Sequence, residues 1–132
     1  MEAHPDVIVD FIFEGGVLVI SVENIGSQPA VRVQVGFDPP FKGLGGTAVV
    51  PDLALFRNIE FLAPKRSIRT LLDSSTAYFA RQEPERITAT IRYFDRAGEE
   101  FSCTIVHDLA IYRDIAYVSN QQRSTTAHGS LT

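Results

Sequence analysis

Residues 30–37, Ala-Val-Arg-Val-Gln-Val-Gly-Phe, carry the clearest structural pattern in the chain. Apolar side chains alternate with polar or small ones, in the order Val31, Arg32, Val33, Gln34, Val35, Gly36, Phe37. A period of two places neighbouring side chains on opposite faces of a β-strand. The stretch therefore predicts a strand whose valines and Phe37 face a core and whose other side chains face solvent.

Similar alternation recurs on both sides of this strand. Further strands are predicted at residues 6–13, 17–24, 67–73, 86–94 and 100–112. The first two form a hairpin through Gly15 and Gly16, and the last strand is long enough to require a bend near Asp108. Residues 38–46 hold two prolines and three glycines and predict a long surface loop.

Residues 53–62, Leu-Ala-Leu-Phe-Arg-Asn-Ile-Glu-Phe-Leu, fit both a helical and a strand period. We expect a short helix near 53–58 followed by a strand. About seven strands with turn residues between them predict an all-β fold, an antiparallel β-sandwich of the immunoglobulin-like type. We expect one domain over residues 1–118 and a disordered C-terminal tail over 119–132, which is almost entirely polar.

Composition argues against several classes of partner. The formal net charge is −4 and the basic residues are dispersed, so we expect no nucleic-acid binding. The longest uncharged, mainly apolar run covers residues 17–22, whereas a membrane-spanning helix needs roughly 20 residues, so we expect no membrane insertion. The acidic start of the chain lacks the features of a signal peptide. The lone Cys103 permits no internal disulfide, and these features together slightly favour the cytoplasm.

Several residues invite a chemical role, and each has a plainer structural interpretation. His107 and Asp108 are strand neighbours that point to opposite faces, so a structural His107 is favoured over a metal ligand. Cys103 lies about 13 Å from His107 along the strand, too far for a catalytic pair, and fits a core cysteine. Ser74 and Ser75 lack the Gly-x-Ser-x-Gly context of a serine hydrolase.

Two loops complete the set of candidates. The glycine-rich residues 43–47 lack the lysine and helix start of a phosphate-binding loop, so a flexible loop is favoured. Asp95, Glu99 and Glu100 crowd the last hairpin, but calcium needs six to eight oxygen ligands, so a solvated acidic turn is favoured. We therefore expect no cofactor and no metal.

Three motifs carry a family resemblance: Pro5-Asp6-Val7-Ile8-Val9, then Val22-Glu23-Asn24-Ile25-Gly26-Ser27-Gln28-Pro29-Ala30, then Tyr93-Phe94-Asp95-Arg96-Ala97-Gly98. Together they resemble a group of uncharacterised bacterial immunoglobulin-like domains, and they are loosely similar to bacterial cell-adhesion-related (CARDB-like) modules. The likeness spans about residues 5–118 and consists of turn residues and strand spacing. It implies the sandwich fold, and it leaves open a membrane tether through a segment upstream of Met1.

The function expected from these observations is a non-enzymatic protein-interaction or accessory module. The alternative is a calcium- or carbohydrate-binding β-sandwich domain. Candidate contact residues are Phe41 and Leu44 in the long loop and Tyr112 and Tyr117 near the end of the last strand, because binding domains often use apolar side chains on end loops. The equally weighted alternative is that these side chains cover the core. A protein partner is expected, but neither its identity nor the oligomeric state follows from the sequence.

Overall fold

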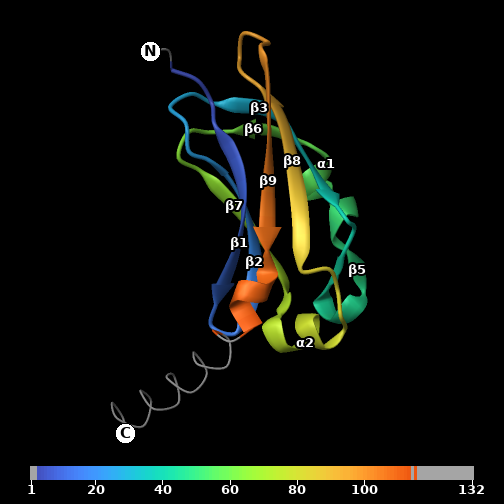
Figure 1. Cartoon of the computed structure of the whole chain (residues 1–132). Helices are drawn as coiled ribbons and strands as arrows, with labels where there is room; N and C mark the ends of the chain where they lie inside the picture. The colour runs from blue at the N-terminus through green and yellow to red at the C-terminus, as the bar shows by residue number, and fades with distance from the viewer. Residues whose placement is uncertain (1–2, 114, 116–132) are drawn as a thin grey trace, which may run out of the picture.

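A computed structural model describes residues 3–113 and 115 (Figure 1). The predicted boundary at residue 118 and the predicted tail at 119–132 lie outside the described residues. The long strands are β1 (Val7–Glu14), β2 (Val17–Asn24), β3 (Ala30–Asp38), β6 (Ile59–Leu62), β7 (Ser67–Ser74), β8 (Arg86–Phe94) and β9 (Glu100–Asp108). They confirm the all-β fold of about seven strands.

These strands form two antiparallel sheets. One sheet has the order β1-β2-β7 and the other the order β6-β3-β8-β9. In a constant-type immunoglobulin domain the fourth strand pairs with the fifth. Here the fourth long strand, β6, pairs with β3 instead, so this sandwich has three strands on one side and four on the other.

The core lies between the two sheets and follows the predicted alternation on most strands. Leu18, Ile20 and Val22 on β2 are fully buried, as predicted. On β8 the buried side chains are Ile87, Ala89, Ile91 and Tyr93. Burial of such aliphatic side chains contributes about 1.5–3 kcal/mol each. The two sheets are therefore held together mainly by apolar contact.

The alternation predicted for residues 30–37 is wrong at Val31. The pairing of β3 with β8 shifts between Val31 and Gln34, and Arg32 within this bulge has a φ of 52°. The extra residue turns Val31 to the outer face, and Ala30, which is fully buried, takes the inner position. From Val33 onward the predicted faces hold.

Short elements occupy the long connections. The segment between β3 and β6 contains β4 (Lys42–Gly43), η1 (Leu44–Gly46), β5 (Ala48–Val49), η2 (Val50–Asp52) and α1 (Ala54–Arg57). The α1 helix and β6 confirm the helix-then-strand interpretation of residues 53–62. No periodicity predicted α2 (Ser75–Ala80), in which Tyr78 is fully buried.

The last strand ends earlier than predicted. β9 stops at Asp108, whose side chain accepts a hydrogen bond from the backbone N–H of Ala110 and so caps η3 (Leu109–Ile111). The predicted bend near Asp108 is therefore the end of the strand. Among the described residues, no helix has both the length and the apolar character needed to cross a membrane.

Candidate interaction site at the loop end

The three motifs singled out in the sequence meet at one end of the sandwich, which we call the loop end. It comprises the segment before β1, the β2–β3 connection (residues 25–29) and the turn of the β8–β9 hairpin (residues 95–99). In Figure 1 these segments lie at the top, and α2 and η3 lie at the opposite end. Residues far apart in sequence thus form one surface.

Asn24, the last residue of β2, organises the loop end. Its side chain is fully buried. Its Oδ1 accepts the backbone N–H groups of Asp6 at 3.1 Å and Gly26 at 3.0 Å, and its Nδ2 donates to the carbonyl oxygens of Gln28 at 2.9 Å and Leu62 at 3.1 Å. An amide side chain offers two donors and two acceptor lone pairs, so every one of them is used. One side chain therefore fixes three segments of the chain.

The N-terminal segment and the β2–β3 connection also touch directly. Ile25 N–H donates to the Asp6 carbonyl at 2.8 Å, and Ser27 N–H donates to the His4 carbonyl at 3.3 Å. A Cβ placed on Gly26 would lie 2.4 Å from the His4 carbonyl oxygen. Only glycine permits this close backbone approach.

The turn of the β8–β9 hairpin is closed by Asp95. Its Oδ1 accepts the N–H groups of Ala97 at 3.0 Å and Glu99 at 2.8 Å, which is an Asx-type turn. Gly98 has a φ of 93° and donates to the Asp95 carbonyl at 3.1 Å. The turn is thus internally satisfied and presents Arg96 and Ala97 to solvent.

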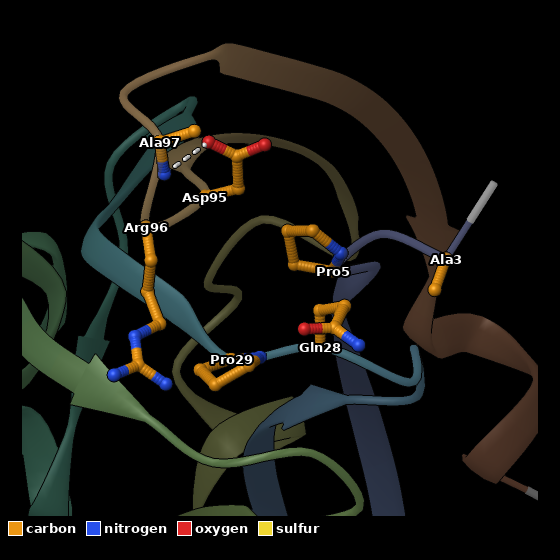
Figure 2. Close-up of a pocket in the computed structure, with 7 residues that line it drawn as sticks. All are labelled: Ala3, Pro5, Gln28, Pro29, Asp95, Arg96 and Ala97. Carbon is orange, nitrogen blue, oxygen red and sulfur yellow. Dashed lines mark hydrogen bonds between the residues drawn. The ribbon is translucent and has the colours of Figure 1, made fainter.

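A hollow of about 240 Å³ lies between these segments, lined by Ala3, Pro5, Gln28, Pro29, Asp95, Arg96 and Ala97. Figure 2 shows the Arg96 side chain running from the hairpin toward Pro29, with Pro5 and Gln28 on the facing wall. Arg96 is exposed and makes no ion pair with any residue in the described part of the chain. The hollow therefore combines two proline rings with an unpaired guanidinium group.

Residues 1–113 match the model of a family described as a domain of unknown function, DUF8453. The chain belongs to this family. No curated protein and no solved structure matches the chain. The DUF8453 match covers both sheets and all three segments of the loop end, and it assigns no activity to them.

Of the predicted contact residues, Phe41, Leu44 and Tyr112 lie toward the other end of this DUF8453 domain and do not form one surface. Phe41 is only 1% exposed and packs at 5.9 Å from the ring of Phe11, so it covers the core, as the alternative interpretation had it. Leu44 is 50% exposed, on η1, which contacts β7 and α2. The Tyr112 ring stacks on Phe13 instead, and Tyr117 lies outside the described residues.

His107 and Cys103 are both partly buried, and both side chains face β1. His107 Nε2 lies 2.9 Å from the Val9 carbonyl oxygen and Cys103 Sγ lies 3.5 Å from that of Val7. The Tyr112 hydroxyl donates to the Phe11 carbonyl at 2.7 Å. These side chains bridge from β9 and η3 to β1, and Figure 1 shows β1 and β9 side by side. A groove of about 270 Å³ beside them is lined by Asp10, Phe11, Val106, His107, Asp108, Leu109, Ile111 and Tyr112.

Sequence reasoning missed a polar cluster at the end opposite the loop end. Asp73 Oδ2 accepts from Arg81 Nη1 at 2.6 Å and from the Gly45 N–H at 3.0 Å, and Asp73 Oδ1 accepts from the Ser74 N–H at 2.8 Å. Burial raises the pKa of the Asp73 carboxyl, but the hydrogen bonds from Arg81, Gly45 and Ser74 together hold it below its ordinary value. Spacing along the chain gave no signal for this cluster because its members come from three separate elements.

This cluster also explains the glycine-rich loop. A phosphate-binding loop would offer its backbone N–H groups to the ligand. Here the Gly45 N–H donates to the Asp73 carboxylate instead. The acidic hairpin is likewise engaged: Asp95 closes its own turn and Glu100 pairs with Arg92 at 2.6 Å. Over residues 3–113 and 115, no three His, Cys, Asp or Glu side chains gather in a way that could hold a metal ion.

Proposed function

We propose that the domain is a non-enzymatic protein-interaction module that binds its partner with the loop end. The observation that carries this proposal is the hollow lined by Pro5, Pro29 and Arg96, where three segments of the chain converge. In immunoglobulin variable domains, loops at one end of the sandwich, including those in the corresponding β2–β3 and β8–β9 positions, make the binding surface. That comparison is an analogy of architecture and supports a place for binding, not a particular partner.

Rigidity of the loop end supports the same proposal. A loop that is already ordered loses less conformational entropy when it binds. The four hydrogen bonds of Asn24 and the Asx-type turn at Asp95 fix the loops before any partner arrives.

The chemistry of the hollow indicates the kind of group that fits it. Proline rings offer rigid apolar walls, and an unpaired guanidinium favours a carboxylate through charge-assisted, often bidentate hydrogen bonds. We therefore expect a protein segment that places an apolar side chain between Pro5 and Pro29 and a carboxylate on Arg96. The motif residues also resemble those of bacterial immunoglobulin-like and cell-adhesion-related modules. We take this resemblance as further support for an adhesive role.

Site-specific crosslinking tests the proposal. A photoreactive amino acid is placed at Gln28, at Ala97 and, as a control, at Thr47 on the opposite end, and each variant is expressed in the native cells. We expect one protein to be crosslinked from Gln28 and Ala97 but not from Thr47. The crosslinked product should disappear when Arg96→Glu is added and persist with Arg57→Glu, a matched charge reversal on α1.

Two outcomes contradict the proposal. One is crosslinking that is equal from Thr47 and from the loop end. The other is crosslinking that survives Arg96→Glu unchanged. Circular dichroism of the variants shows whether a loss reflects binding or folding, and exposed Arg96 should tolerate the substitution.

A further inference from the structure

The edge of β9 that faces away from β8 is a second surface, separate from the loop end. β9 is the last strand in the order β6-β3-β8-β9, and it pairs with β8 along its whole length without a register shift. On its other side, no hydrogen bond joins the backbone of residues 100–108 to any described part of the chain. An unpaired edge presents a row of N–H and C=O groups that another strand can use.

The other three edges of the two sheets are covered or short. Along β1, alternate carbonyl oxygens accept hydrogen bonds from Cys103, His107 and Tyr112. β4 and η1 pack against the second half of β7, so closely that a Cβ on Gly43 would lie 2.3 Å from the Leu72 carbonyl oxygen. β6 has only four residues. β9 is therefore the longest edge that the described residues leave open.

β9 also lacks the features with which proteins usually protect an edge. Lysines, prolines, inward-pointing charges and bulges are the common means of blocking an unwanted strand. Between Glu100 and Asp108 the strand reads Phe-Ser-Cys-Thr-Ile-Val-His, with no proline, no lysine or arginine and no carboxylate. Most of these side chains favour extended backbone. The strand is thus well suited to pair with another one.

A groove of about 270 Å³ lies on the same side of β9. It is lined by residues of β1, of η3 and of the last part of β9, and by none of β8, so it lies on the unpaired side of the strand (Figure 1). Val106 and Ile111 on its walls are 51% and 61% exposed, whereas Phe11 is buried. A strand added to β9 would turn alternate side chains toward this groove.

Two carboxylates in the groove indicate the charge of the added strand. Asp10 and Asp108 are both exposed, and neither forms an ion pair with any residue that the structure describes. Arg86 is the cross-strand neighbour of Asp108, but it belongs to β8 and lies beyond ion-pair distance. A lysine or arginine on the added strand would complement both carboxylates, and opposite charges across a strand pair stabilise it.

The same charges disfavour a second copy of β9 as the added strand. Antiparallel pairing of two β9 strands over their full length would centre on Thr104 and set Glu100 opposite Asp108 at both ends. Like charges directly opposite one another destabilise a strand pair. The formal net charge of −4 adds a general repulsion between two copies. A basic segment of another protein has neither disadvantage.

We infer that the open edge of β9 accepts an extended, basic segment of another protein as a fifth strand of the β6-β3-β8-β9 sheet. An apolar side chain of this segment enters the groove, and a lysine or arginine lies against Asp10 and Asp108. In strand addition of this kind, main-chain hydrogen bonds give affinity and side-chain pockets give specificity. The groove lies at the end of β9 away from the β8–β9 turn, so the inference is independent of the loop end.

Hydrogen exchange of the full chain with a synthetic peptide tests the inference. The probe is acetyl-Arg-Leu-Thr-Val-Thr-Val-Thr-amide, which in antiparallel register sets its arginine opposite Asp108 and its leucine toward the groove. We expect the peptide to slow exchange at alternate amides of residues 101–107, because only those N–H groups face the open edge. The same peptide with glutamate in place of arginine should bind at least about tenfold more weakly in a fluorescence titration.

Three variants locate the peptide. Asp10→Lys reverses a charge on the groove wall and should weaken binding at least about tenfold. Glu60→Lys is the matched control, because Glu60 is an exposed carboxylate on β6, at the other edge of the same sheet. It should leave binding unchanged. Arg96→Glu should also leave binding unchanged, which separates this edge from the loop end. All three residues are exposed, so the variants should fold, and circular dichroism checks this.

Several results would overturn the inference. One is the absence of binding at millimolar peptide, and another is equal binding of the arginine and glutamate peptides. A third is binding that leaves exchange at residues 101–107 unchanged. The last is slow exchange at all of these amides before any peptide is added. If that protection rises with protein concentration, a second copy occupies the edge, and if it does not, a segment outside the described residues does so.

Discussion

The Nε2 atom of His107 lies 2.9 Å from the carbonyl oxygen of Val9, 98 positions away in the chain and in the opposite sheet. A carbonyl oxygen only accepts hydrogen bonds, so Nε2 carries the hydrogen. With Cys103 on Val7 and Tyr112 on Phe11, side chains engage alternate carbonyls along the outer edge of β1. Unpaired strand edges invite pairing with other chains, and this arrangement covers one of them.

Replacing His107 by alanine should lower the free energy of unfolding by about 1–3 kcal/mol, because it leaves the Val9 carbonyl without a partner and removes the ring that packs 4.9 Å from Phe11. Urea denaturation measures the change. Thr104→Ala, on the outward face of the same strand, should alter the free energy by less than about 0.5 kcal/mol. Equal effects of the two substitutions would contradict a bridging role for His107.

Replacing Asn24 by alanine should cost about 3 kcal/mol or more, since it leaves four backbone groups without their buried partner. Asn58→Ala is the control, because the exposed Asn58 side chain bonds, within the described part of the chain, only to the Glu60 side chain. Hydrogen exchange should rise at Asp6 and Gly26 in the Asn24 variant. Unchanged protection at both amides would show that the loop end does not depend on Asn24.

Two glycines should respond in opposite ways to alanine. Gly26→Ala places a Cβ 2.4 Å from the His4 carbonyl oxygen and should destabilise the fold. Gly36→Ala meets nothing within 4 Å and should be neutral or stabilise the domain by up to about 1 kcal/mol, since alanine restricts the unfolded chain more than glycine. Thermal unfolding of both variants makes the comparison. A similar drop in Tm for both would contradict it.

Asp73 should make stability depend on pH. Its folded-state pKa lies below the ordinary value of 3.8, so its carboxylate contributes stability above that value and loses it as pH falls through the lower, folded pKa. The unfolding free-energy difference between the wild type and Asp73→Asn should thus be largest near neutral pH and shrink below about pH 4. Glu99→Gln, an exposed carboxyl on the hairpin, is the control. A difference that stays constant down to about pH 2 would contradict the assignment.

Cys103 should react slowly with thiol reagents. Burial raises the pKa of its thiol, and the nearby Asp6 carboxylate adds to this. Labelling with iodoacetamide at neutral pH should therefore be much slower in the native protein than in urea. Equal rates in the two conditions would show that the thiol is freely accessible.

The sequence predicted the sheets better than the site, and the reason is physical. Alternation reports which face of a strand is buried, so the inner positions of β2 and β8 followed directly from it. The pattern could not report the bulge at Arg32, because the seven alternating residues look the same whether or not an extra residue is accommodated. Nor could it report α2, since six residues give less than two helical turns of periodicity.

The loop end needed tertiary information. The turn residues Asn24, Gly26 and Asp95 stand out in the sequence, but their signal is local and says nothing about which turns meet. The prediction of an exposed Phe41 was wrong for another reason. The prolines and glycines around it indicate a surface loop, but its ring folds back against Phe11. Residues in loops take their burial from contacts that no periodicity records.

The bridges from His107 to Val9 and from Tyr112 to Phe11 also decide how the domain responds to mechanical force. β1 and β9 run in the same direction, so tension that pulls Val7 and Leu109 apart along the strands strains the bridges together and not one after another. Hydrogen bonds loaded in shear in this way must all break together, whereas a pull across the strands would break them one after another. The domain should therefore resist force along its long axis better than force applied across it.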